Sequence, residues 1–279
     1  MTDKTRRFLY HLYMGSFLIY LLIPLLVMSG AAFNDNKVPS VWPWKGLTGR
    51  WFVDLSQDAT MWISFRNTIL VAIAVVILSV PIGTAAAIMI NSLQGRVRSL
   101  MYGLMVAPIL APGAVIGIST ILFWNTLNVP TGLHLSVLGQ VSYIAAFVML
   151  LVLARLQSFD LNQEEAALDL GASHSQVLRR ILLPHLYPAV GAGAAIAFFQ
   201  SIENFNVTLF TRGTSNTLTV YVFSKVRSGI TPTINALAFL LIVVTLGAAI
   251  IYETRRRRRA AILAAQEAEG RRAEEAGVI

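Results

Sequence analysis

Cysteine is absent from this chain of 279 residues, and only 13% of its residues are charged. Without cysteine, the chain can form no disulfide bond, no reactive thiol and no cysteine-ligated metal site. An HExxH zinc motif, a GxxxxGK[ST] phosphate loop and a GxSxG nucleophile motif are also missing. The four histidines show no metal-ligand spacing; they are His11, His134, His174 and His185. We therefore expect no enzyme activity, no metal site and no cofactor bound by this chain.

The scarcity of charge accompanies an excess of apolar residues. Hydrophobic residues make up 56% of the chain, and the mean hydropathy is +0.65. Such a composition is too apolar for a soluble domain and predicts a protein surrounded by membrane lipid. The formal net charge of +8 does not indicate nucleic-acid binding, because excess lysine and arginine in a membrane protein more often mark its cytoplasmic side.

Six apolar stretches are long enough to cross a bilayer. They cover about residues 12–33, 67–90, 100–123, 138–156, 186–210 and 233–252. We predict an all-α membrane protein with a transmembrane domain over residues 1–253 and a basic, charged tail over residues 254–279. The first stretch is interpreted as an uncleaved span, because it is longer than a usual signal-peptide core and more spans follow. Pro24 is expected to kink it.

The distribution of basic residues predicts the orientation. If both termini are cytoplasmic, fifteen of the 22 lysine and arginine residues lie inside, including the block from Arg255 to Arg259. An even number of spans and the positive-inside rule both favour this arrangement. The same count places the polar segment between spans four and five in the cytoplasm. The arginine block is also suited to binding anionic lipid headgroups.

A tryptophan-rich stretch follows the first span. Residues 34–65 cannot cross a bilayer, and they include Trp42, Trp44 and Trp51 together with two prolines. An indole ring can bury its apolar face while its N–H group stays in water, so these tryptophans are expected at the headgroup level. An aromatic ligand cage is the alternative.

The polar segment from Asp160 to Pro184 predicts two short helices joined by a turn. Asn162 is expected to cap the first helix, and Gly171 is expected to end it in the left-handed conformation. Ser173 and Gln176 form a capping-box pattern for the second helix, which Pro184 is expected to end. An ordinary loop between two spans is the plain alternative.

The residues of this segment carry a more specific pattern. Glu165-Ala166-Ala167 is followed after three residues by Gly171 and after nine more by Ile181-x-Leu183-Pro184. The pattern resembles the EAA motif of binding-protein-dependent ABC importer permeases. The resemblance implies that residues 158–184 form a cytoplasmic coupling-helix loop that docks on a separate ATP-hydrolysing subunit, as in type I importers. It also implies that ATP and Mg²⁺ are bound by that partner.

Glu203 lies within the fifth predicted span, where an ionisable side chain is costly and is by default a functional candidate. Gln200, Asn204 and Asn206 add polar groups near it, mainly on one side of a helix. These four residues are candidates for lining a translocation path. The alternative, which we hold equally open, is that Glu203 pairs with a basic residue such as Arg212 or Arg66, or reaches the membrane interface.

Downstream of Ser201 the resemblance becomes narrower. The sequences SIENF, TLTVY and RSGITPTINALA are similar to the second permease subunit of spermidine/putrescine importers, although Glu203 stands where that family is expected to have an aspartate. The resemblance implies a bacterial inner-membrane protein that transports a polyamine. The implied partners are a second permease, a dimer of ATP-binding subunits and an external solute-binding protein. A sugar, iron, thiamine or opine substrate remains open, as does an ATP-independent carrier.

Overall fold

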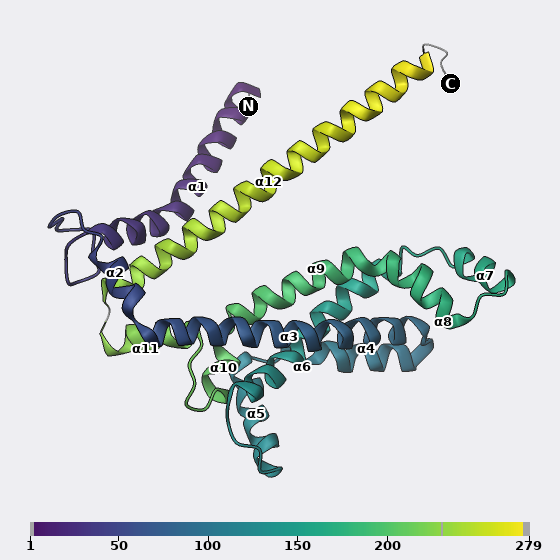
Figure 1. Ribbon diagram of the computed structural model, residues 1–279, viewed down its shortest axis with the longest axis horizontal. Helices are drawn as coiled ribbons and strands as arrows, with labels where there is room; N and C mark the ends of the chain where they lie inside the picture. Colours follow the sequence, from purple (N-terminus) through teal and green to yellow (C-terminus); the bar gives the residue numbers. More distant parts are fainter. Residues whose placement is uncertain (1–2, 230, 276–279) are drawn as a thin grey trace. The chain divides into compact units, whose positions relative to one another are not determined.

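The computed structural model describes residues 3–229 and 231–275, and these residues are mostly helical. An isolated bridge between Asn34 and Leu47 is the β-type pairing found among them. The contacts divide the chain into two compact units, residues 1–58 with 225–279 and residues 59–224. Figure 1 shows the path of the chain through both.

The first unit contains three helices, which are α1 (Asp3–Phe33), α2 (Arg50–Gln57) and α12 (Pro232–Glu275). Both α1 and α2 contact α12. Phe33, Phe52 and Phe239 bring the three helices together, with ring centroids between 5.0 and 5.8 Å apart. Pro24 lies inside α1, and Figure 1 shows that this helix bends along its length, as its proline predicts.

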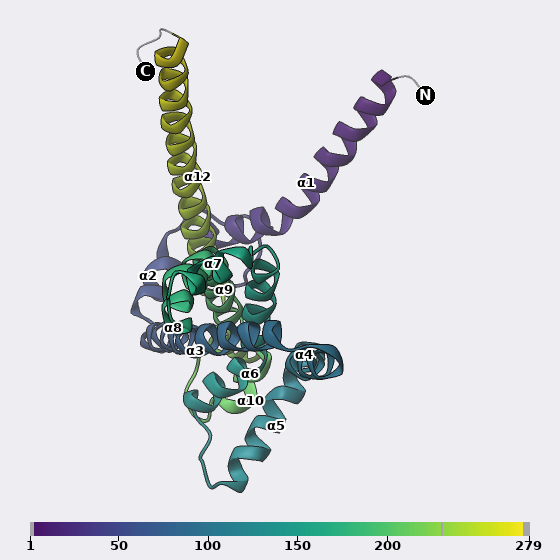
Figure 2. The ribbon, with the colours of Figure 1, turned by 90° about the vertical axis from the view of Figure 1, so that its right-hand side faces the viewer.

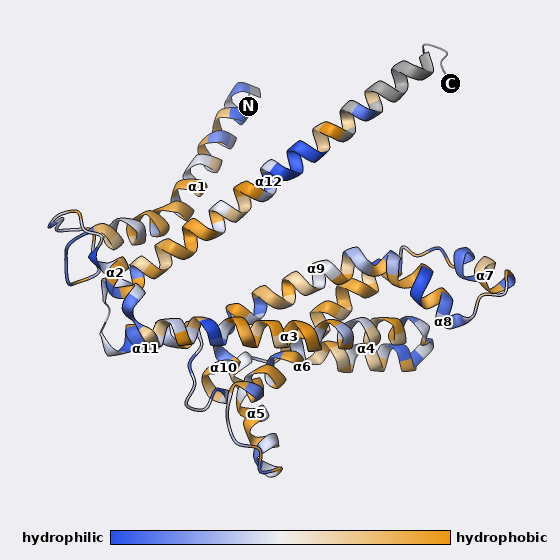
Figure 3. Ribbon diagram, viewed as in Figure 1, coloured by the Kyte–Doolittle hydropathy of each residue, from blue (hydrophilic) through white to orange (hydrophobic). Residues whose placement is uncertain are grey.

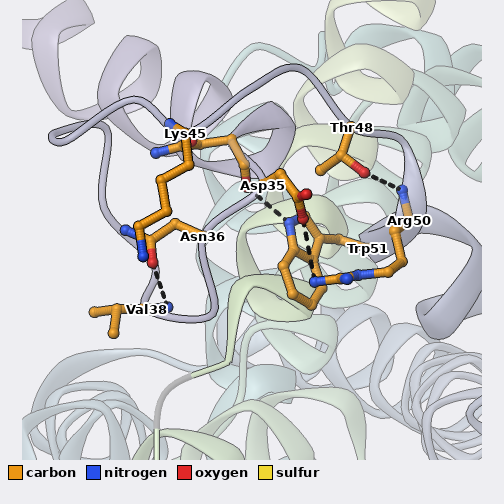
Figure 4. Close-up of polar contacts among 8 residues, drawn as sticks. Asp35, Asn36, Val38, Lys45, Thr48, Arg50 and Trp51 are labelled. Carbon is orange, nitrogen blue, oxygen red and sulfur yellow. Dashed lines mark hydrogen bonds and ion pairs between the residues drawn. The ribbon is translucent and has the colours of Figure 1, made fainter.

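Asn34 organises the loop between α1 and α2. Its side chain is fully buried, donates to the carbonyl oxygens of Ser40 and Pro43, and accepts from the backbone N–H of Lys45. Trp51 donates its indole N–H to the carbonyl oxygen of Asn34 at 2.9 Å. Figure 4 shows this bond beside the ion pair between Arg50 and Asp35.

The expectation of a headgroup belt is wrong for Trp51. Its side chain is only 7% exposed, lies under the Arg50 guanidinium and gives its N–H to the protein and not to water. Trp42 is 85% exposed and Trp44 is also exposed, so the belt prediction still stands for these two. Sequence composition alone does not separate the tryptophan that packs from those that remain available to the membrane interface.

The second unit is built on three helices that pack closely. They are α3 (Ala59–Ser92), α6 (Leu133–Leu156) and α9 (Leu183–Ile202), and each contacts the other two. Their shared core is aliphatic, with Val75, Ile90, Ile144 and Leu186 fully buried. This close packing holds the remaining helices of the unit around a common support.

Shorter helices surround this support. They are α4 (Gly95–Leu110), α5 (Gly113–Thr126), α7 (Asn162–Asp169), α8 (His174–Val177), the π-helical segment η1 (Leu178–Leu182) and α10 (Asn206–Thr211). The helix α11 (Leu218–Ser228) begins in the second unit, and its residues from Lys225 on belong to the first. Five helices of the described residues are long and apolar enough to cross a membrane, or six if the pair of α4 and α5 counts as one span. The six predicted spans correspond to α1, α3, the pair of α4 and α5, α6, α9 and α12.

Most predicted spans are shorter than the helices that contain them, and the third, fifth and sixth differ from the structure in a further way. The stretch at 100–123 is not one straight helix, because α4 and α5 meet at a bend of 105°, which Figure 2 shows. Ala111, which precedes Pro112, is extended at φ −77° and ψ 135°, as a residue before proline prefers to be. The stretch at 186–210 breaks after Ile202.

The last difference concerns α12. The predicted span covers residues 233–252 and the prediction left the tail either helical or disordered, and in the structure the helix continues to Glu275. Glu253 forms ion pairs with Arg256 at 3.6 Å and with Arg257 at 2.7 Å, and both arginines lie about one helical turn after it. Figure 3 shows the hydrophobic part of α12 followed by a hydrophilic block within the same helix. The predicted division into a domain and a tail is therefore not marked by a break in secondary structure.

Candidate functional site

The polar segment between α6 and α9 has the predicted order of helix, turn and helix. At its start, the carboxylate of Asp160 accepts from the backbone N–H of Asn162 at 3.0 Å. The prediction that Asn162 caps α7 is therefore wrong, because the acid two residues earlier serves the first turn. Glu164 and Glu165 lie in this first turn, where the helix dipole favours negative charge.

The turn after α7 has the predicted geometry. Gly171 has a φ of +84°, in the left-handed region that glycine adopts without a steric penalty. Its N–H donates to Leu168, and the next N–H, of Ala172, donates to Ala167. Ser173 and Gln176 then exchange both hydrogen bonds of a capping box and so begin α8.

The prediction that Pro184 ends the second helix is wrong. The chain passes from α8 through η1 directly into α9, and Pro184 lies in the first turn of α9. The backbone N–H of Leu183 donates to Leu178, five residues back, which is a π-type bond. A widened turn before a proline gives its ring room and allows the helical path to continue.

The two ends of the segment are joined by side-chain contacts between α6 and α9. The Arg155 guanidinium Nε donates to the carbonyl oxygen of His185 at 3.1 Å, and the His185 ring Nε2 lies 3.3 Å from the carbonyl oxygen of Arg155. The His185 ring also meets the edge of Phe159. We call these three residues the stem clasp. It holds the end of α6 to the start of α9.

The loop itself offers an unpaired surface. Glu165 and Ala166 are exposed, Ala167 is partly buried, and no residue of α7 is fully buried. Leu161 and Leu170 are exposed large apolar residues, with Leu170 at 89%. Figure 1 shows α7 protruding at the end of the second unit, and Figure 3 shows its polar character. A protruding helix with acidic and apolar side chains is suited to docking on another protein.

The remaining motif residues lie where the loop rejoins the bundle. Ile181 and Leu183 are partly buried, whereas Pro184 is exposed. Val177, which the motif does not include, is the buried anchor of α8 at 3% exposure. The pattern therefore extends from the exposed tip to the root of the loop.

A cavity of about 340 Å³ in the second unit gathers all four of the predicted path residues. We call it the Glu203 cavity; its lining residues are Ile109, Ala111, Gly113, Ile116, Tyr143, Phe147, Gln200, Glu203, Asn204, Phe205 and Asn206. Glu203 does not lie in the middle of a helix, as the span prediction had it. It follows the last residue of α9, and Asn206 begins α10.

Helix ends therefore surround the Glu203 cavity. It lies where α9 gives way to α10 and where α4 gives way to α5. Broken helices at membrane depth expose backbone groups, which must be satisfied by protein or by a polar cavity. Gly113 permits the close approach of these ends, because a Cβ at this position would lie 2.9 Å from the Cβ of Asn206.

Asn204 has a structural part in forming the break. Its side-chain oxygen accepts from the backbone N–H of Val207 at 3.2 Å, and its amide donates to the Tyr143 hydroxyl. Its backbone carbonyl accepts from Thr219. An asparagine that satisfies the first N–H groups of a new helix favours ending the old one.

A buried polar network supports the same place. Gln140 of α6 accepts from Ser201 at 2.6 Å and donates to Thr208 of α10 at 3.0 Å, and one turn earlier in α6 Ser136 bonds to Thr211. All of these side chains are buried. The sequence analysis missed them, although Ser136 and Gln140 form a polar pair one turn apart at the start of an apolar stretch, which is the signal that could have found them.

Glu203 is free to meet a ligand. Its side chain is exposed in this single chain, and no ion pair of the described residues includes it. The expected alternative partner Arg212 instead donates to Ser215 and to Asn216, the latter at 2.6 Å. The ion-pair alternative is therefore not found in the part of the chain that the structure describes.

Three aromatic residues that the sequence analysis did not select also line the cavity, namely Tyr143, Phe147 and Phe205. A carboxylate attracts an ammonium group, aromatic faces attract it through their quadrupole, and the Gln200 and Asn206 amides offer hydrogen-bond acceptors. Tyr143 and Phe147 lie one turn apart on α6, which is the spacing that puts both on one helical face. The cavity is therefore chemically suited to an organic cation.

Comparisons with known proteins identify relatives of this chain. A family model described as "Binding-protein-dependent transport system inner membrane component" matches residues 79–260. The Escherichia coli K12 spermidine/putrescine transport system permease protein PotC is 29% identical over 235 residues, covering 84% of this chain and 88% of that protein. The putrescine transport system permease protein PotI of the same strain is 32% identical over 232 residues, covering 80% and 82%.

Solved structures show the same fold at lower identity. A bacterial alginate ABC transporter in complex with an alginate-bound periplasmic protein matches with a TM-score of 0.70 at 17% identity, over 89% of this chain and 93% of that chain. The MetNI methionine ABC transporter matches with a TM-score of 0.54 at 18% identity, over 77% and 99%.

Proposed function

This chain belongs to the family of binding-protein-dependent transport system inner membrane components, and from that membership we propose that it forms the translocation path for a polyamine, a small organic cation of the spermidine and putrescine type. The chain is a multi-pass permease subunit of an ABC importer. The observation that carries the substrate proposal is the Glu203 cavity, where an unpaired carboxylate lies among aromatic rings. Similar permeases named for spermidine and putrescine support it.

The proposed assembly supplies what the chain lacks. A second permease would complete the path, a dimer of ATP-binding subunits would hold ATP and Mg²⁺, and an external binding protein would deliver the substrate. The alginate relative was solved with its periplasmic protein, which supports a partner of this kind. We further propose that both termini and the α7 segment face the cytoplasm, because the basic residues are concentrated on that side.

Within this assembly, we assign α7 and α8 the role of a coupling element. Closure of the ATP-binding subunits would displace the protruding surface around Glu165, and the stem clasp would carry the displacement into α6 and α9. A helix of 20 residues is about 30 Å long, so α9 reaches from the loop at Leu183 to the cavity at Glu203. One rigid element thus joins the two parts of the proposed mechanism.

The path residues divide between two roles. Glu203 attracts an ammonium group, while Gln200 and Asn206 offer further polar contacts. The Asn204 side chain already bonds to Tyr143 and to the first turn of α10. Its role is therefore to position Glu203 at the helix break, and direct contact with the substrate is left to the other three residues. Ala166, Ala167, Gly171, Ile181, Leu183 and Pro184 shape the coupling loop.

Replacement of the carboxylate tests the substrate proposal. In proteoliposomes with the binding protein outside and ATP inside, Glu203→Gln should lower putrescine uptake at least tenfold, because the neutral amide retains the shape but loses the charge. Glu203→Asp should retain a measurable fraction. Asp54→Asn is the matched control, because Asp54 is an exposed acid on α2 outside the cavity. Equal uptake by the Glu203→Gln and Asp54→Asn variants would contradict the role of Glu203.

A further inference from the structure

A second cavity lies farther along the same two helices. It has a volume of about 460 Å³, and we call it the Arg98 cavity. Its lining residues are Arg98, Ser99 and Tyr102 of α4 together with Leu150, Leu153, Ala154 and Gln157 of α6. Neither the family membership nor the predicted motifs assign a role to it.

On α6, one helical face lines both cavities. Tyr143 and Phe147 line the Glu203 cavity, and Leu150 and Ala154 line the Arg98 cavity. Their spacings of four, three and four residues keep them on one stripe of the helix. Tyr143 and Ala154 are eleven residues apart, which corresponds to about 16 Å along the axis. The two cavities are therefore successive hollows along one face of α6.

The same relation holds on α4. Ile109 lines the Glu203 cavity, and Arg98 and Tyr102 line the Arg98 cavity. Arg98 and Ile109 are also eleven residues apart, so the separation along the helix axis is the same as on α6. The chain passes the Arg98 cavity first on α4 and the Glu203 cavity first on α6. Met105 lies on this stripe between the two groups and is partly exposed. The two cavities therefore follow one another along the α4 and α6 pair, with the apolar Met105 between their α4 residues.

The two hollows carry opposite charges. The Glu203 cavity has an unpaired carboxylate, whereas Arg98 brings a guanidinium that forms no ion pair within the described residues. In the proposed orientation, the Arg98 end is the cytoplasmic end, because Arg96 and Arg98 lie in the first turn of α4 and basic residues mark the cytoplasmic side. A cation moving from Glu203 towards the cytoplasm would leave an attractive site and meet a repulsive one.

We propose that the Arg98 cavity is the cytoplasmic exit of the translocation path and that Arg98 repels the cationic substrate there. This inference rests on the proposed function. Repulsion at the exit favours release and lowers the affinity of the path for substrate already in the cytoplasm. At a separation of several ångströms and an effective dielectric constant between those of water and the protein interior, one like charge changes such an affinity by about fivefold.

Inhibition of uptake by internal substrate tests this assignment. The complete complex is reconstituted with ATP and graded unlabelled putrescine inside, and the initial uptake of labelled putrescine is measured with binding protein outside. Arg98→Gln should lower the internal putrescine concentration that halves uptake by about fivefold. Arg98→Lys keeps the charge and should behave as the unmodified complex does.

Arg96→Gln is the matched control, because it removes the same charge at a position that is two residues from Arg98 and lines neither cavity. Equal internal inhibition of the Arg98→Gln and Arg96→Gln variants, with normal insertion of both, would overturn the exit assignment. Failure of the unmodified complex to take up putrescine would instead contradict the proposed substrate, so the two failures are distinguishable.

Discussion

Substitution of Gly171 tests whether the left-handed turn between α7 and α8 is needed for coupling. A Cβ added there would meet nothing within 4 Å, so the cost of a side chain comes from the φ of +84° alone. Gly171→Ala is expected to cost about 1 kcal/mol in the native turn and to displace α8 relative to α7. Substrate-stimulated ATP hydrolysis by the complex should fall while insertion is retained.

Asparagine tolerates the left-handed conformation better than alanine, so Gly171→Asn should lie between the unmodified chain and Gly171→Ala. Gly191→Ala is the control, because Gly191 also has open space around it but lies inside α9, where alanine is favoured. If Gly171→Ala stimulates as well as Gly191→Ala, the turn does not carry the coupling.

Gly83 tests packing in the same way. A Cβ on this residue of α3 would lie 2.5 Å from the carbonyl oxygen of Ala145 and 2.7 Å from the Cβ of Val148, both on α6. Because these atoms belong to the backbone or its immediate branch, they cannot move aside without separating the helices. Gly83→Ala should destabilise the complex by about 1–3 kcal/mol, seen as a lower midpoint of thermal unfolding in detergent.

Gly103→Ala is the corresponding control, because the Cβ would meet nothing within 4 Å on α4. An unfolding midpoint for Gly83→Ala that equals that of Gly103→Ala would mean that α3 and α6 do not pack as closely in the assembled permease.

At this scale, the sequence predicted what depends on one residue and its near neighbours. The left-handed turn at Gly171 and the capping box of Ser173 with Gln176 were both predicted, because each is a local rule. The contact between Gln140 and Ser201 was not, because it joins residues 61 positions apart. Tyr143 was not predicted to line the cavity with Glu203 either. Nothing in the sequence distinguishes this aromatic residue from one that packs in the core.

Among the elements, α9 differs most from its prediction. Pro184 was expected to stop a helix, and Glu203 was expected to lie within one, yet the helix runs on past the proline and ends before the acid. Both outcomes depend on hydrogen bonds that a residue count does not reveal, namely the π-type bond to Leu178 and the cap by Asn204. The break between α4 and α5 could have been predicted from the sequence, because Pro112 favours an extended conformation of the residue before it.

The stem clasp gives a prediction for two elements together. Arg155→Gln removes the guanidinium that bonds to α9, and His185→Ala removes the ring that bonds back to α6. Because the two bonds join the same pair of helices, the losses of stability in the double variant should not add, and the coupling energy should lie near the lower end of about 0.5–3 kcal/mol. Thermal unfolding of the four complexes measures it. Additive losses would show that the two bonds act separately.

For the whole molecule, the absence of cysteine is an experimental advantage. A single cysteine at Ser175 in the coupling loop should react with a membrane-impermeant maleimide only from the cytoplasmic side, whereas one at Trp42 should react only from outside. The expectation follows from the distribution of lysine and arginine and from the alternation of the spans. Labelling of both positions from the same side would contradict the proposed orientation.

The helix α12 is longer than a membrane span requires. At 1.5 Å per residue its 44 residues extend about 66 Å, roughly twice the hydrocarbon thickness of a bilayer. The sequence predicted the span and the basic block but not that they share one helix, since composition alone permits either a helical or an irregular tail. The proposed orientation would place the part beyond Glu253 on the cytoplasmic side of the membrane.

The central claim is that this permease couples ATP hydrolysis in a partner to the import of a polyamine. The most direct test is ATP hydrolysis by the complex that copurifies with this chain, measured in lipid with its binding protein and with putrescine, spermidine, maltose or ferric iron. We predict that an ATPase copurifies and that only the two polyamines stimulate it. Stimulation by maltose or iron alone would contradict the substrate, and a preparation without any ATPase would contradict the coupling role of the segment from Asp160 to Pro184.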